Sequence, residues 1–156
     1  PNKATPADLK PDDPNVPDAY AIEGNFEKVL VLRMKHGADL LKGLETLVKQ
    51  KGIRNGVILS GIGSVRGYRL HNVTGRDYPV PDMFFGAPNT PADFIAMQGY
   101  INNGVIHAHV VLALGDDKGT TVSGHLEKGT TTGFDKALTT AILSHLGWQH
   151  GGWPSR

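Results

Sequence analysis

The sequence predicts a strand-rich α+β domain, and three observations carry this prediction. Its 156 residues include 20 glycines and 10 prolines, a composition that indicates many turns. Several short apolar or β-branched segments are separated by turn-forming residues, which is typical of strands. One segment instead has the periodicity of an amphipathic helix. Since the length is that of about one domain, we predict a Pro-rich extended arm over residues 1–19 and a single domain over residues 20–156.

The first half of the domain begins with a strand over residues 26–34, FEKVLVLRM. The next segment, ADLLKGLETLVKQKG, predicts a helix, and Gly52 is suited to end it. Its apolar residues stand at i, i+1, i+4, i+7 and i+8, which form one helical face: Leu40, Leu41, Leu44, Leu47 and Val48. Residues 54–73 then predict a strand, a glycine-containing bend and a second strand.

The second half predicts a loop and further strands. Residues 74–91 contain four prolines, so we expect a long loop rather than a central strand. Residues 93–101 and 104–114 predict two strands joined by the hairpin turn NNG. Residues 120–129 predict the return strand after the turn GDDKG. The last segment, residues 130–146, begins with a strand-like composition and then fits either a helix or a strand.

Composition excludes several classes of function. The formal net charge is +1, from 16 basic and 15 acidic residues that are mixed along the chain, so DNA binding gains no support from charge. The chain has no cysteine, which leaves histidine and carboxylate as transition-metal ligands. No apolar run is long enough for a membrane span. A start at Pro1 fits removal of a leader or a trimmed sequence, so a soluble cytoplasmic protein and an exported one both stay open.

Three histidines form the candidate site. His107 and His109 point to the same face of their strand, about 7 Å apart along it. If the following hairpin is centred on Asp117, His109 lies directly opposite His125, on the same face. Three imidazoles and an open fourth position are the arrangement of a catalytic zinc site. A slip of one residue in the turn would send His125 to the other face.

Other interpretations of these residues stay open. The three histidines could be surface residues or hydrogen-bonded core residues. His71 could approach them from a neighbouring strand, although its spacing does not require this. The segment SGIGSVRG matches neither the dinucleotide nor the P-loop fingerprint, and no G-x-S-x-G motif is present.

The order of these segments resembles the plants-and-prokaryotes conserved domain, or PPC domain, over residues 26–146. In that family an arginine ends the first strand, a G-E-D-type turn opens the helix, and a G-x-G bend, a G-x-I strand end, an H-x-H strand and a G-G-H-L strand follow. This chain matches these features, in that order, with Arg33, Gly37 and Asp39, Gly61 and Gly63, Gly99 and Ile101, His107 and His109, and Gly124 and His125. An acidic residue expected beyond the last histidine has Asp135 as its near match.

The resemblance implies a compact α+β fold, a mostly antiparallel and strongly curved β-sheet packed with a few helices, and a homotrimer. It also implies a divalent metal, zinc by analogy with the structurally related acetolactate decarboxylase, held by His107, His109 and His125. Prokaryotic members are often described as DNA-binding proteins because plant members carry AT-hook segments. This chain has no R-G-R-P hook.

Two hypotheses follow. In the first, the chain binds a divalent metal, most simply Zn²⁺, through the three histidines and catalyses a lyase or hydrolase step on a small oxygen-rich substrate. The metal would polarise a carbonyl or lower the pKa of water toward about 7, with Arg33, Arg66, His71 and Asp135 as candidate supporting residues. In the second, the chain is a non-enzymatic trimeric module with a DNA-binding or regulatory role.

Overall fold

A computed structural model of the chain describes residues 19, 21, 24–75, 80–133 and 140–147, the last range by its backbone alone. The predicted arm over residues 1–19 therefore lies outside the described residues, except for Ala19. The elements are, in chain order, β1 (Asn25–Arg33), α1 (Leu40–Gln50), β2 (Gly56–Val73), β3 (Asp82–Ala87), β4 (Ala92–Asn102), β5 (Val105–Leu114), β6 (Thr121–Leu126), β7 (Thr131–Thr132) and β8 (Thr140–Gly147).

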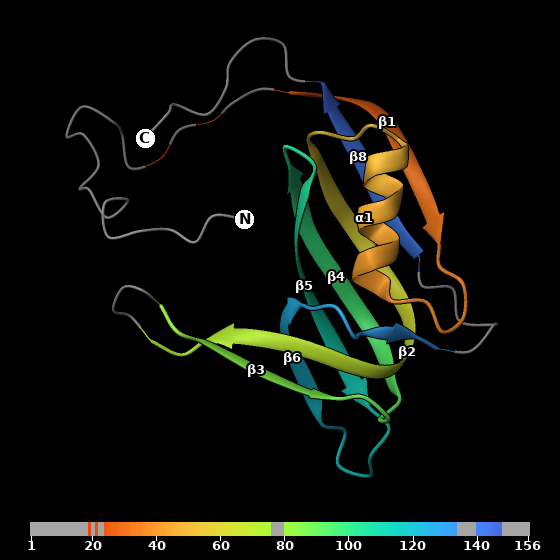
Figure 1. Cartoon of the computed structure of the whole chain (residues 1–156), viewed down its shortest axis with the longest axis vertical. Coiled ribbons are helices and arrows are strands. Elements are labelled where there is room, and N and C mark those ends of the chain that lie inside the picture. The colour runs from red at the N-terminus through yellow and green to blue at the C-terminus, as the bar shows by residue number, and fades with distance from the viewer. Residues whose placement is uncertain (1–18, 20, 22–23, 76–79, 134–139, 148–156) are drawn as a thin grey trace.

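The strands form one antiparallel sheet that curves back on itself (Figure 1). Its main path runs β1-β8-β2-β4-β5-β6, and β6 also pairs with β2. The long strand β2 makes this closure possible, because Gly56–Val65 pairs with β4 whereas Leu70 and His71 pair with β6. The predicted class, an α+β fold with a curved antiparallel sheet, is confirmed, with a single helix among the described residues.

Helix α1 packs against one face of this sheet (Figure 1). Leu40, Leu44 and Val48 are buried, as the predicted apolar face requires. Strand β5 contributes every second residue to the same core, at Ala108, Val110 and Leu112. Because strand side chains alternate between faces, His107 and His109, the two neighbours of Ala108, project from the opposite face of the sheet. The core therefore fixes which face presents the histidines.

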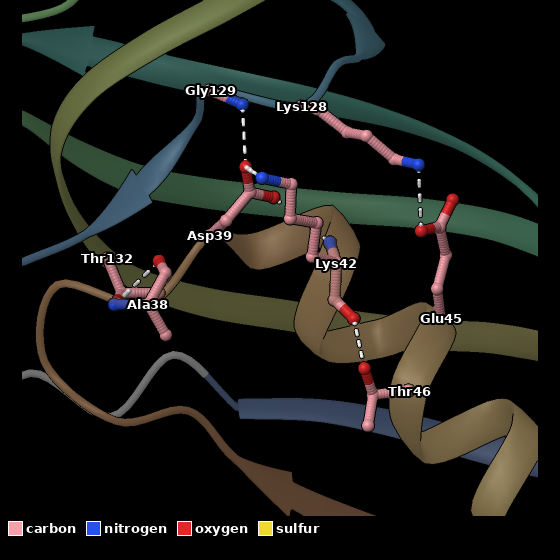
Figure 2. A network of polar contacts seen from close by, with 8 residues as sticks. All are labelled: Ala38, Asp39, Lys42, Glu45, Thr46, Lys128, Gly129 and Thr132. Carbon is pink, nitrogen blue, oxygen red and sulfur yellow. Dashed lines mark hydrogen bonds and ion pairs between the residues drawn. The ribbon is translucent and has the colours of Figure 1, made fainter.

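The start of α1 is attached to the segment between β6 and β7 (Figure 2). One carboxylate oxygen of the N-cap residue Asp39 accepts a hydrogen bond from the backbone N–H of Lys42 at 3.0 Å. The other oxygen accepts from the backbone N–H of Gly129 at 2.8 Å. An ion pair between Lys128 and Glu45, 3.0 Å long, joins the same two segments. Asp39 thus caps the helix and anchors the chain that leaves β6.

Several sequence predictions need correction. The loop predicted over residues 74–91 contains strand β3, which pairs with β2 along Tyr68–Val73. The reason is that the four prolines flank β3 and none lies inside it, so its ladder hydrogen bonds are intact. Residues 54–73 do not form two strands around a bend. Instead β2 is one continuous strand. Its pairing register shifts between Ile58 and Ser60 and again between Val65 and Gly67, and these irregularities accommodate the curvature of the sheet.

The predicted hairpin at NNG is confirmed. Asn103 and Gly104 both have positive φ, 48° and 80°, as expected for the tight turn between β4 and β5. The segment over residues 130–146, which fitted helix or strand, forms strands β7 and β8 where it is described. No helix in the described part of the chain is long and apolar enough to cross a membrane.

Candidate metal centre

The hairpin between β5 and β6 sets the register of the histidines. The Leu114 N–H donates to the Thr120 carbonyl at 2.8 Å, and the Asp116 carboxylate accepts from the N–H groups of Lys118 and Thr120. These bonds fix a turn centred on Asp117. The register that follows pairs His109 with His125, as the sequence predicted.

The three rings converge on a common volume. The Nε2 atoms of His107 and His109 lie 3.1 Å apart. One ligand nitrogen from each of His107, His109 and His125 lies within 4.8 Å of the other two. Two nitrogens on one tetrahedral zinc, each at 2.0 to 2.1 Å, would stand about 3.3 Å apart. The spacing of the first pair therefore already fits a single ion.

The ring orientations also fit a shared ligand. The His125 ring stands nearly edge-on to its two partners, at 72° to His107 and 86° to His109, with centroids 4.7 and 5.3 Å away. The rings of His107 and His109 are tilted by 41° at 5.1 Å. Imidazoles in such arrangements can direct in-plane lone pairs toward one point, whereas flat stacking of all three rings could not.

Electrostatics favour neutral rings. The pKa of His125 is lowered to about 4, first by burial and then by the neighbouring His71, His107 and His109, which together outweigh the opposite effect of Glu127. Burial also lowers the pKa of His107, with His109 and His71 as further causes. At pH 7 both rings are therefore neutral. Neutral imidazole has a free lone pair, which is the form that binds metal.

Strand β4 supports the exposed side of the cluster. Tyr100 pairs with His107 across the β4–β5 ladder, and the two rings stack at 4.9 Å with an angle of 11° between their planes. Gln98 is paired with His109 in the same ladder. The Tyr100 ring thus restricts rotation of the His107 ring, while its own exposed side borders the site.

A fourth histidine joins the cluster from β2. His71 is paired with His125, and their ring centroids are 4.4 Å apart at an angle of 32°. Its Nδ1 lies 2.7 Å from Glu127 Oε1, and its Nε2 lies 4.0 Å from Asp82 Oδ1. The sequence suggested His71 as a candidate, and the β2–β6 pairing is what places it beside the three histidines.

Sequence reasoning missed Glu127 and Asp82. Glu127 stands two residues after His125, so alternation along a strand was a signal that the two share a face. Asp82 gives no such signal, because the prolines around it predict a loop. Both carboxylates become neighbours of His71 only through strand pairing.

The remaining candidates lie elsewhere or outside the described residues. Arg33 ends β1 and lines a hollow at the start of α1 together with Met34, Lys35 and Asp39. Arg66 is exposed on β2, five residues before His71, a separation of about 17 Å along an extended strand. Asp135 falls outside the described residues.

Solved structures share this fold. A metal-containing protein from Archaeoglobus fulgidus has 24% sequence identity and a TM-score of 0.63, and the match covers 82% of this chain and 86% of that chain. A plant- and prokaryote-conserved (PPC) protein from Pyrococcus horikoshii has 18% identity and a TM-score of 0.66, with 84% and 87% covered. A protein from Bacteroides thetaiotaomicron whose description proposes DNA binding has 19% identity and a TM-score of 0.57, with 78% and 82% covered.

Sequence comparison gives one partial relative and one family. The bifunctional protein GlmU of Synechococcus sp. (strain JA-2-3B'a(2-13)) is 31% identical over 104 residues, which are 65% of this chain. The chain spans about 15% of the length of that relative, so the match concerns only a small part of GlmU. The family model described as the Plants and Prokaryotes Conserved (PCC) domain matches residues 21–137. This match covers most of the chain and confirms the resemblance to the plants-and-prokaryotes conserved domain, which is abbreviated either PPC or PCC. The chain belongs to the PCC domain family.

Proposed function

We propose that this PCC-domain protein binds a divalent metal ion, most simply Zn²⁺, through His107, His109 and His125. The observation that carries the proposal is the convergence of one nitrogen from each ring within 4.8 Å on one face of the sheet. Imidazole suits zinc, copper, iron and nickel better than magnesium or calcium, which prefer oxygen ligands. Zinc fits best, because three protein ligands with an open fourth position are a common catalytic zinc arrangement.

Two further observations support this proposal. The lowered pKa values of His107 and His125 keep both rings in the metal-binding form at neutral pH. In addition, the Archaeoglobus fulgidus protein with the same fold is described as metal-containing.

We propose further that the site acts on a small oxygen-rich substrate in a lyase or hydrolase step. When bound, such a metal supplies Lewis-acid polarisation of a substrate oxygen or activation of water. The chain surrounds this position with groups that can orient a polar ligand. His71 with Glu127 lies on one side and the exposed face of Tyr100 on the other. Arg33 and Arg66 are not among these neighbours.

Substitution with Co²⁺ tests the ligand set. A four-coordinate site with nitrogen ligands should give visible d–d absorption bands in the wild-type protein. We expect His107→Ala and His125→Ala to lose these bands, and His36→Ala, which alters a ring bonded to the Gly133 carbonyl instead, to keep them. Unchanged bands in the first two variants would contradict the proposed ligands.

We also propose that the chain assembles as a homotrimer. The number three is what the family resemblance implies, and support for association comes from large hydrophobic side chains that the described residues leave exposed, since exposed apolar surface can mark an interface: Phe26, Val29, Val31, Leu59, Ile62, Val73, Val80, Met83, Phe84, Ile95, Tyr100 and Val105. Native mass spectrometry tests this directly. A mass of three chains is expected, and a monomer at micromolar concentration would contradict it.

A second candidate function is a non-enzymatic module associated with DNA. The Bacteroides thetaiotaomicron neighbour, whose description proposes DNA binding, favours it. The net charge of +1, from 16 basic and 15 acidic residues mixed along the chain, gives it no support. We therefore rank it below the metal-dependent function.

A further inference from the structure

We propose that His71, His125 and Glu127 form a second divalent-cation site, which adjoins the three-histidine site and shares His125 with it. One nitrogen of each ring and one carboxylate oxygen all lie within 4.8 Å of one another. The proposal goes beyond the proposed function, because two of its three ligands take no part in the first site.

The ligands come from a different part of the sheet than those of the first site. His71 is contributed by β2 and Glu127 by the residue after β6, whereas His107 and His109 lie on β5. His125 stands between them, because it is paired with His109 on one side and with His71 on the other. The row His109, His125, His71 therefore offers ligand positions on both sides of one ring.

A shared imidazole is chemically reasonable here. A histidine ring has two nitrogens, each able to bind metal once it has lost its proton. If one nitrogen of His125 serves the first ion, the other can serve an ion held by His71 and Glu127. Binding of the second ion then releases the remaining ring proton to solvent.

The immediate surroundings of His71 match those of a metal ligand. Ligating histidines usually donate their other ring N–H to a carboxylate or carbonyl, which fixes the ring orientation. Nδ1 of His71 faces Glu127 at 2.7 Å, and Nε2 faces Asp82 at 4.0 Å. An ion on the Nδ1 side leaves the Nε2–H directed toward Asp82. At 4.0 Å, Asp82 is too far for a hydrogen bond to Nε2, so it contributes negative charge beside His71 rather than fixing the ring.

Charge and burial separate this site from the first. The three-histidine site has neutral ligands, whereas Glu127 and Asp82 bring two carboxylates next to His71. The side chains of His71 and Glu127 are only 17% and 26% exposed, so part of their hydration is already lost. A divalent cation would balance this charge. It would replace the proton between Nδ1 and Oε1 and widen their separation to about 3.3 Å, the spacing of two ligands on one ion.

Zinc stoichiometry tests the site. Metal-free wild-type protein, titrated with Zn²⁺ and followed by calorimetry, should bind a second equivalent more weakly than the first. Glu127→Gln should bind only the first equivalent. Glu45→Gln removes a carboxylate from the surface ion pair with Lys128 and should retain both. One equivalent in the wild type, or a second equivalent that persists in Glu127→Gln, would overturn the proposal.

A double variant separates this proposal from the proposed function. His107→Ala/His109→Ala removes two ligands of the first site and leaves His71, His125 and Glu127 intact. It should lose the tighter equivalent and retain the weaker one. Loss of the weaker equivalent alone in Glu127→Gln, with the tighter one retained, would show that the two sites are separate. If the double variant retains the tighter equivalent, the proposed three-histidine site is wrong. The second site is then tested separately by whether Glu127→Gln loses the weaker equivalent.

Electron paramagnetic resonance tests the sharing of His125. Two Cu²⁺ ions joined by one imidazolate are exchange-coupled, so the signal of protein loaded with two equivalents should be much weaker than twice that of one. Folding of each variant is checked by circular dichroism. Two additive, uncoupled copper signals would overturn the assignment of His125 to both sites.

Discussion

His109 on β5 and His125 on β6 lie directly opposite each other, with ring centroids 5.3 Å apart and ring planes at 86°. The relationship follows from the hairpin between the strands, whose turn is centred on Asp117. One residue more or less in that turn would reverse the face on which His125 lies. The turn therefore determines whether three histidines or only two are available to one ion.

Close contact between β4 and β5 holds His107 in place, and Gly99 permits it. A Cβ atom at Gly99 would lie 2.2 Å from the His107 carbonyl oxygen and 2.8 Å from the Ala108 Cα. We expect Gly99→Ala to push the strands apart and lower the free energy of unfolding by about 1 to 3 kcal/mol. Gly115→Ala is the control, because that position has open space, and it should change stability by less than about 0.5 kcal/mol. Urea denaturation measures both, and equal stability of the two variants would contradict the contact.

The anchoring of α1 gives a second prediction. Asp39→Ala removes acceptors for the N–H groups of Lys42 and Gly129, so we expect a loss of about 2 kcal/mol in the free energy of unfolding. Glu45→Gln alters only a surface ion pair with Lys128 and should cost at most about 1 kcal/mol. The two variants are compared by thermal and urea unfolding. A larger loss in Glu45→Gln would show that the ion pair, not the cap, joins these segments.

The stability of the metal-free protein should depend on pH through His125. Its pKa is about 4 in the folded protein and near 6.5 in the unfolded chain, so the unfolded chain takes up the proton first as the pH falls. Stability present above about pH 6.5 is therefore lost progressively down to about pH 4. For this half-exposed ring we expect a loss on the order of 1 to 2 kcal/mol after solvent screening. Urea unfolding of metal-free wild type and His125→Gln at several pH values measures it, and identical profiles would contradict the assignment.

DNA binding separates the two candidate functions. With a net charge of +1, we expect no measurable affinity for duplex DNA even at low salt. Fluorescence anisotropy with a labelled duplex at about 50 and 200 mM salt checks this. Binding at the lower concentration that falls steeply at the higher one would favour the DNA-associated module instead.

Much of this fold could be predicted because local signals agreed with the tertiary structure. The apolar stripe of α1, the NNG turn and the hairpin centred on Asp117 each specify their own geometry. The register of His109 with His125 followed from counting within one hairpin, since both residues lie eight positions from its centre. Such features depend on contacts that are close in the sequence.

The sequence predictions were wrong or incomplete where strands pair with segments outside their own hairpin. Four prolines made residues 74–91 look incompatible with a sheet, but Met83, Phe84 and Phe85 pair with the far half of β2. For the same reason His71 could not be placed beside His125, because the contact between β2 and β6 depends on how the sheet closes. Asp82 joins the cluster through the pairing of β3 with β2, in a segment that the prolines predict as a loop, whereas the two-residue spacing of His125 and Glu127 was a local signal for a shared face.

The most direct test of the central claim is the metal content of the purified protein. Wild-type protein, dialysed against metal-free buffer and analysed by inductively coupled plasma mass spectrometry, should retain about one tightly held divalent ion per chain, with zinc predominant. His107→Ala, His109→Ala and His125→Ala should each lose this ion, whereas His36→Ala should keep it. Native-like metal content in the three variants, or a wild-type protein that takes up no divalent metal even when it is supplied, would contradict the account.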